Sequence, residues 1–95
     1  MSIGFVGLGT MGRPMAMNLL KSGADLTVHA AVDDSYPAFR AAGARATAEL
    51  ADIAEAQTIF LCLPGSDAVR EVVLGERGLI HRLAPGQAIV DTSTQ

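Results

Sequence analysis

Several residue types that mark particular classes of protein are scarce in this chain. Its 95 residues include one cysteine, two histidines, three phenylalanines, one tyrosine and no tryptophan. A single cysteine excludes an intramolecular disulfide, and the two histidines lie far apart in sequence, so no metal-binding motif is present. The few aromatic side chains and the net charge of −3 argue against a nucleic-acid surface, which needs stacking groups and basic residues.

Long hydrophobic runs are also absent. No segment reaches the roughly 18 apolar residues of a membrane-spanning helix, so we expect no membrane association. The N-terminus lacks the basic residues of a secretory signal, and glycines and Pro14 interrupt its apolar stretch. We therefore expect a cytoplasmic protein.

The composition is that of a folded protein with a core. The chain is 49% hydrophobic and 18% charged, which excludes a disordered chain and fits one small domain. Cys62 lies in the apolar run 58–63, and no residue type suited to activate a thiol is close to it in sequence. We expect a buried structural thiol rather than a nucleophile.

The most informative segment lies at the N-terminus, where an apolar run at 3–6 leads into Gly7, Gly9 and Gly12. These residues have the G-x-G-x-x-G spacing, and a helical pattern follows them, which is the context of a dinucleotide-binding motif. The first glycine permits a tight turn, the second lets backbone approach a diphosphate, and the third allows the helix to pack closely on the strand. The helix start adds unpaired N–H groups and a positive dipole end.

Apolar periodicity and turn residues predict alternating strands and helices along the chain. The N-cap of the second predicted helix, which runs to about residue 42, is expected to be Asp33, Asp34 or Ser35. The N-cap of the fourth predicted helix, which runs to residue 74, is expected to be Ser66 or Asp67. The alternation indicates an α/β fold with an open parallel sheet. Strands are expected at 3–6, 26–29, 44–46, 58–63 and 88–91, helices at 11–22, 35–42 and 66–74, and a helix or helical turn at 49–56.

Ligands of open α/β sheets bind beyond the carboxyl ends of the strands. The loops at 7–12, 29–33, 63–66 and 91–95 follow predicted strands and are therefore expected to converge on one crevice. On the first helix, Met11, Met15 and Leu19 share one face and are expected to pack in the core.

The segment from Gly4 to Leu19, GFVGLGTMGRPMAMNL, resembles the opening of the β-hydroxyacid dehydrogenases. This family includes 3-hydroxyisobutyrate dehydrogenase and tartronate semialdehyde reductase and is related to 6-phosphogluconate dehydrogenase. Leu63-Pro64 and the segment at 91–94 are similar to two further landmarks of the family. The resemblance covers the whole chain, which corresponds to about the first third of a family member.

The resemblance implies a Rossmann-like, doubly wound parallel sheet that is incomplete at its C-terminal side. Residues 1–95 would form the N-terminal part of an NAD(P)-binding domain, without the C-terminal domain that carries substrate contacts and assembly into a homo-oligomer. Ser93 would offer its hydroxyl to the carboxylate of a small substrate. The implied cofactor contacts are Gly7, Leu8, Gly9, Thr10, Met11, Gly12, Ala30, Leu63, Pro64 and Thr94.

The choice of cofactor departs from the family pattern. Many members place an Asn-Arg pair after the second strand, and the arginine favours the 2′-phosphate of NADP, whereas this chain has Ala30 and Ala31. Asp33 and Asp34, which follow, would repel a 2′-phosphate, although a capping role is the simpler reading. The sequence therefore favours NAD over NADP.

The family's catalytic lysine segment falls after residue 95, so no catalytic residue is assigned. Lys21 is interpreted as a solvated charge at a helix end. The leading interpretation is part of an oxidoreductase that transfers hydride between a nicotinamide cofactor and a small 3-hydroxy acid; on its own, the chain would be inactive. The alternatives are a non-catalytic NAD(P)-binding module and an imine reductase with the same cofactor domain.

Overall fold

The computed structural model describes residues 2–30, 34–63, 65–76 and 78–92. Within these residues, no helix has the length and apolar character needed to cross a membrane. In chain order, the elements are β1 Ser2–Val6, α1 Gly12–Lys21, β2 Asp25–His29, α2 Tyr36–Ala41, β3 Arg45–Ala46, α3 Leu50–Ile53, β4 Thr58–Leu61, α4 Ser66–Leu74, the 3₁₀ helix η1 Leu79–His81, and β5 Ala88–Asp91.

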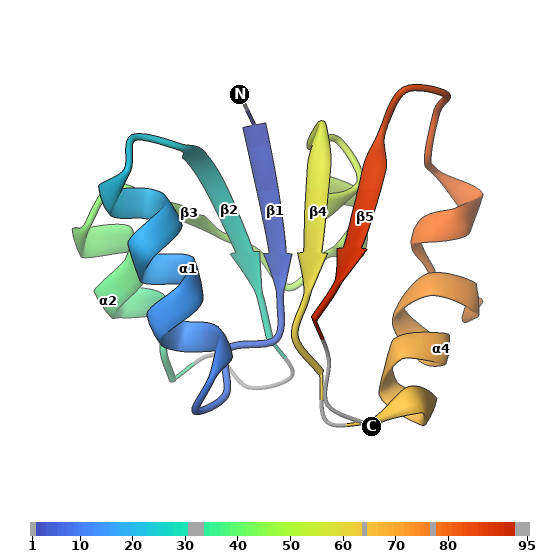
Figure 1. The fold of residues 1–95 in the computed structure, drawn as a ribbon, viewed down its shortest axis with the longest axis horizontal. Helices are drawn as coiled ribbons and strands as arrows, with labels where there is room; N and C mark the ends of the chain where they lie inside the picture. Colours follow the sequence, from blue (N-terminus) through green and yellow to red (C-terminus); the bar gives the residue numbers. More distant parts are fainter. Residues whose placement is uncertain (1, 31–33, 64, 77, 93–95) are drawn as a thin grey trace.

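The five strands form one parallel sheet in the order β3-β2-β1-β4-β5 (Figure 1). The strand β1 lies at the centre, where Gly4 pairs with Thr27 of β2 on one side and with Ile59 of β4 on the other. The chain first winds outward from β1 through β2 to β3 and then crosses back to β4 and β5. This confirms the Rossmann-like, doubly wound sheet.

Alternation along the strands divides the core between the two faces of the sheet. One face carries Ile3, Phe5, Leu26 and Val28, which pack with residues of α1 and α2. The other face carries Val6, Ile59 and Leu61, which pack with residues of α3, α4 and η1. Two layers of helices therefore sandwich the sheet, as parallel strands require.

Several local predictions are wrong. Met11 is 63% exposed, because it is the N-cap of α1 and precedes the face that Met15 and Leu19 turn towards the core. Cys62 is half-buried, since it follows the last residue of β4.

The helix caps also differ from the expectation. Gly65 is the N-cap of α4, so Ser66 is its first helical residue and Asp67 lies inside the first turn. Ser35 is the N-cap of α2, as one of the alternatives predicted, but it makes no capping hydrogen bond through its side chain. Asp33 lies outside the described residues.

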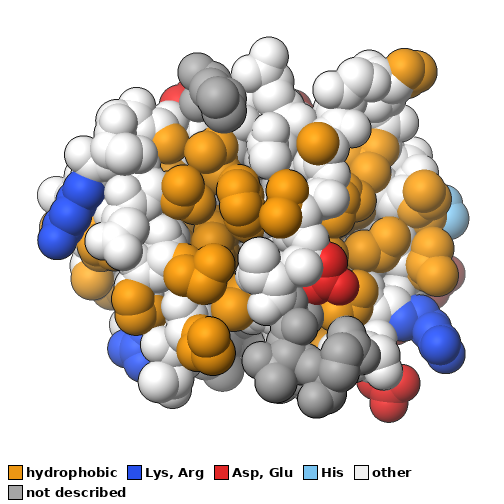
Figure 2. All heavy atoms as spheres, viewed as in Figure 1, with side chains coloured by type: hydrophobic (Ala, Val, Ile, Leu, Met, Phe, Trp, Pro, Cys, Tyr) orange, Lys and Arg blue, Asp and Glu red, His pale blue; other side chains and the backbone are white. Residues whose placement is uncertain are grey.

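The β5 edge of the sheet is open to solvent. All four residues of β5 are exposed, with Ile89 at 36% and Val90 at 38%. Val90 pairs with Phe60, whose ring stacks on Phe5 at a centroid distance of 6.0 Å. Among the described residues, no helix packs on the β4 and β5 half of the sheet face that carries Phe5. Figure 2 shows hydrophobic side chains gathered near the middle of the surface on the viewed side.

An exposed apolar edge strand is a template for pairing with another chain. We predict that the 95-residue chain self-associates and that Val90→Lys reduces the association without lowering the unfolding temperature. Sedimentation velocity over a concentration series measures the change. Leu74→Lys, at an exposed position on α4 (60% exposed), is the matched control and should leave the association unchanged. Association that persists unaltered in V90K would contradict this role of β5.

Candidate functional site

The turn after β1 lies where the carboxyl ends of three strands meet, at the lower edge of the sheet in Figure 1. The Gly7 N–H donates to the His29 carbonyl oxygen at the end of β2 (2.9 Å), and the Cys62 N–H donates to the Val6 carbonyl oxygen (2.8 Å). On the far side of β4, the Thr92 N–H donates to the Leu61 carbonyl oxygen (2.8 Å). Backbone hydrogen bonds therefore hold the predicted crevice loops at one edge.

Gly7 and Gly12 are required by the protein's own packing. Gly7 has φ +104°, and a Cβ on it would overlap the Cys62 carbonyl group. A Cβ on Gly12 would overlap the Gly7 carbonyl oxygen. The backbone of the turn therefore lies so close to the start of α1 and the end of β4 that no side chain fits between them, and only glycine is compatible with this packing.

At Gly9, by contrast, no contact within the described residues requires a glycine. Its φ is not positive, its surroundings are exposed, and none of those residues comes within 4 Å of the position of a Cβ. Glycine costs conformational entropy on folding, so a glycine without an internal reason indicates close approach by something else. The open space beside Gly9 is where backbone of the turn would meet a ligand.

The helix α1 begins directly beside this space. Met11 is its N-cap and makes no side-chain capping hydrogen bond, and the first turn contains no acidic residue. The first N–H groups of a helix lack intrahelical partners and carry the positive end of its dipole, which favours an anion. An uncapped helix start next to an unobstructed glycine backbone fits the diphosphate of a dinucleotide, with Thr10 and Met11 exposed on the turn. Leu8 is buried in the core below it.

The end of β2 is held by Tyr36, a residue that the sequence interpretation missed. Its hydroxyl accepts from the Ala30 N–H (2.9 Å) and lies 2.9 Å from the Thr47 carbonyl oxygen, to which it donates. The His29 ring Nδ1 lies 3.0 Å from the same oxygen. The start of α2 therefore positions Ala30. The only signal in the sequence is that Tyr36 is the single tyrosine of the chain.

The end of β4 brings Leu63 to the turn. Its Cδ2 atom would lie 3.2 Å from a Cβ on Gly7, so the Leu63 side chain borders the turn, and its contact with the cofactor stays a prediction. The Thr92 hydroxyl donates to the Leu61 carbonyl oxygen (2.7 Å) and so supports the sheet. Four other residues singled out in the sequence, Ala31, Pro64, Ser93 and Thr94, lie outside the described residues. Their roles stay predictions.

A hollow of about 530 Å³ opens beside the turn, between α1 and α2. Arg13, Pro14 and Met17 lie on the side of α1 that borders it, and Thr10 belongs to the turn before the helix. Its lining consists of Thr10, Arg13, Pro14, Met17, Asp34, Ser35, Ala38 and Phe39.

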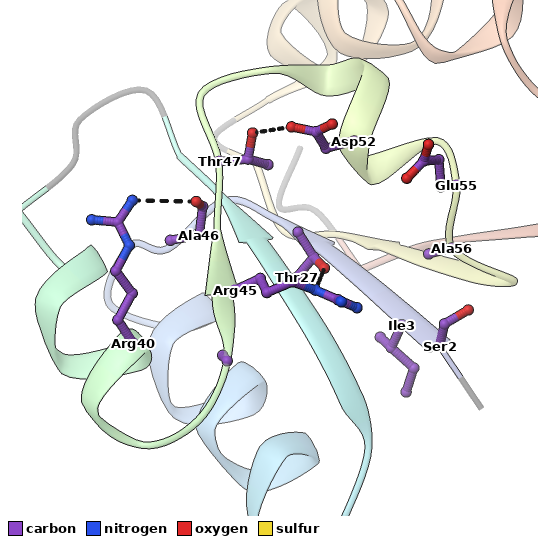
Figure 3. Close-up of a pocket in the computed structure, with 11 residues that line it drawn as sticks. Ser2, Ile3, Thr27, Arg40, Arg45, Ala46, Thr47, Asp52, Glu55 and Ala56 are labelled. Atoms are coloured by element: carbon purple, nitrogen blue, oxygen red, sulfur yellow. Dashed lines mark hydrogen bonds between the residues drawn. The ribbon is translucent and has the colours of Figure 1, made fainter.

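A second hollow, of about 510 Å³, lies away from the turn, near β3 and α3 (Figure 3). Most of its charged groups are already engaged. Arg45 donates to Asp25 (2.7 Å) and Thr27, the Thr47 hydroxyl donates to Asp52 (2.6 Å), and Arg40 donates to the Ala46 carbonyl oxygen (3.3 Å). The arrangement is that of a mutually satisfied polar surface, and we assign it no chemistry.

Comparison with known proteins supports the interpretation of the turn. A family model described as the NAD binding domain of 6-phosphogluconate dehydrogenase matches residues 2–95. The chain belongs to this family. Membership in this NAD binding domain family confirms the expected cofactor class, NAD or NADP, and agrees with the geometry at Gly9.

Two of the chain's curated relatives are dehydrogenases. The chain is 39% identical to mitochondrial 3-hydroxyisobutyrate dehydrogenase of Rattus norvegicus over 93 residues, covering 97% of this chain and 28% of that protein. It is 40% identical to NAD-dependent L-serine dehydrogenase of Pseudomonas aeruginosa over 93 residues, covering 97% and 31%. Psf3, solved in complex with NADP+ and 2-OPP, matches with a TM-score of 0.89 and 32% identity, covering 98% and 34%. The chain thus spans about a third or less of these proteins.

The contrast between glycines gives a direct test. We predict that Gly9→Ala changes the free energy of unfolding by less than about 1 kcal/mol, because the protein leaves space for a methyl group. The same variant should weaken NADH binding by about tenfold, which corresponds to ~1.4 kcal/mol. Denaturant titration and nicotinamide fluorescence measure the two effects.

Gly12→Ala is the matched control, because it meets backbone and should destabilise the fold by roughly 1–3 kcal/mol. A G9A protein that binds NADH normally would show that the open space at Gly9 is not used.

The Tyr36 hydroxyl provides a second prediction. Tyr36→Phe keeps the buried ring but leaves the Ala30 N–H without its partner, so we expect a loss of about 1–3 kcal/mol in stability. Chemical denaturation measures the loss. An unchanged denaturation midpoint would mean that Tyr36 does not hold the end of β2.

Proposed function

We propose that this chain is the N-terminal NAD(P)-binding part of an oxidoreductase that transfers hydride between a nicotinamide cofactor and a small 3-hydroxy acid. The observation that carries the proposal is the unobstructed backbone of Gly9 beside the uncapped start of α1. The family and the named relatives supply the redox context for this diphosphate site. The named relatives are about three times longer than this chain, so the activity of the whole protein is part of this proposal.

The substrate class follows from what the named relatives have in common. 3-Hydroxyisobutyrate and L-serine are both carboxylates with a primary alcohol on C3. We propose a substrate of this kind, whose carboxylate accepts a hydrogen bond from the Ser93 hydroxyl. In the sequence, Ser93 comes two positions after the end of β5, and the carboxyl ends of parallel strands are where such sheets bind their ligands.

The residues of this chain would bind and orient the cofactor rather than move protons. When bound, the nicotinamide accepts the hydride from C3 of the alcohol. The alcohol proton must pass to a base, and Lys21 does not fit this role, because it ends the 10-residue α1 roughly 15 Å from the turn. We propose that a lysine beyond residue 95 is the base, so that the isolated chain binds cofactor without turnover.

We propose NAD as the preferred cofactor. Asp34 lines the hollow beside the turn, where its carboxylate disfavours the dianionic 2′-phosphate of NADP. The cytoplasmic location and the assembly into a homo-oligomer remain predictions, and the rat relative is a mitochondrial protein.

The deciding experiment uses the full-length protein with NAD+ and a panel of small carboxylates. We expect NADH formation with 3-hydroxy acids and none with 2-hydroxy acids of the same size, because hydride leaves from C3. The isolated 95-residue chain should bind NADH and produce none. NADH binding without oxidation of any alcohol, together with reduction of a cyclic imine by NADPH, would identify an imine reductase instead. Binding with neither reaction would identify a non-catalytic module.

A further inference from the structure

Met11 is a large apolar side chain that lies exposed on the glycine turn. It is 63% exposed, whereas Met15 and Met17, on the following turns of α1, are half-buried and pack against the core. The thioether sulfur is the one group of the turn at 7–12 that mild oxidants attack, and its accessibility favours that attack. Among the described methionines, Met11 is therefore the one most open to oxidation.

The start of α1 has hydrogen-bond donors next to this side chain. The Arg13 N–H donates to the Gly9 carbonyl oxygen (3.0 Å), and Pro14 has no N–H. Among the described residues, none accepts from the Met11 or Gly12 N–H. Met11 holds the N-cap position, from which a side-chain acceptor reaches the first turn of a helix, but it makes no capping hydrogen bond. These donors are thus left to a ligand.

Oxidation of the Met11 sulfur would put an acceptor at this position. When hydrogen peroxide transfers one oxygen atom to the sulfur, the O–O bond breaks, an S–O bond forms, and the proton of the transferred oxygen passes to the departing hydroxide, which leaves as water. The sulfur is oxidised by two electrons and becomes polar. The sulfoxide oxygen carries partial negative charge and lies three bonds from Cβ, as the amide oxygen of glutamine does. It therefore competes with an anion for the donors at the start of α1 and repels its charge.

We propose that Met11 is an oxidation site that controls the affinity of the glycine turn for its dinucleotide. Reduced Met11 leaves the donors of α1 to the diphosphate, and the sulfoxide weakens that contact. A bound dinucleotide covers the turn and so protects the Met11 sulfur from peroxide. The inference rests on the proposed function, because it requires a diphosphate on the turn.

The test treats the full-length protein with hydrogen peroxide and follows each methionine by peptide mass spectrometry. Met11 should be oxidised at least about threefold faster than Met15 and Met17, and saturating NAD+ should slow the oxidation of Met11 alone among the three. After removal of the peroxide, the oxidised protein should bind NADH about fivefold more weakly, measured by nicotinamide fluorescence. Met11→Gln, which imitates the sulfoxide oxygen without an oxidant, should show a loss of similar size.

Met11→Leu has no sulfur at this position, so the treated protein should bind NADH as its own untreated sample does. Met15→Leu is the matched control, because it removes a half-buried methionine from the same helix and should keep the full response to peroxide. A response that persists in M11L, through Cys62 or another group, or an oxidised wild type that binds NADH normally, would overturn the inference and leave the proposed function intact. An untreated wild-type protein that binds no NADH would overturn the proposed function, and this inference with it.

Discussion

The close approach of three backbone segments at the end of β1 determines how this structure is built around its site. Gly7, the Cys62 carbonyl group and Gly12 lie so close together that no Cβ fits between them. Two hydrogen bonds, from Gly7 to His29 and from Cys62 to Val6, join β1 to the strands on both sides at the same level. Since β1 is the central strand, this contact also sets where α1 begins.

As a consequence, the three glycines of the turn have different roles. Gly7 and Gly12 serve the fold, whereas no described residue comes within 4 Å of a Cβ on Gly9, which is the proposed contact with the diphosphate. Because the two structural glycines lock the turn against β4 and α1, the backbone at Gly9 and the start of α1 are fixed at the place proposed for the diphosphate. Binding then requires little rearrangement of the protein, which reduces its entropic cost.

The two sides of the turn, towards β2 and towards β5, differ in how far this chain encloses them. On the β2 side, Tyr36 anchors Ala30 by a hydrogen bond, and the hollow with Arg13 and Asp34 lies beyond it. On the β5 side, the edge strand is exposed, but its start is attached to the core by Gln87, whose amide donates to the Ala54 and Ala56 carbonyl oxygens (2.5 and 2.6 Å). The β2 side of the turn is thus more enclosed by this chain than the β5 side.

Local pattern was sufficient for the order and type of the strands and α-helices, because apolar periodicity and turn glycines act over a few residues, but it did not predict η1. The strand predicted at 3–6 and the helix predicted at 11–22 correspond to β1 Ser2–Val6 and α1 Gly12–Lys21, which differ from the predictions only at their ends. Burial of Met11 and Cys62 was not, since it depends on where each helix or strand ends. Nor were the Tyr36 anchor and the placement of Arg13 and Asp34, 21 positions apart in the chain, around one hollow. Such arrangements depend on how the sheet places the helices, and no short-range pattern encodes them.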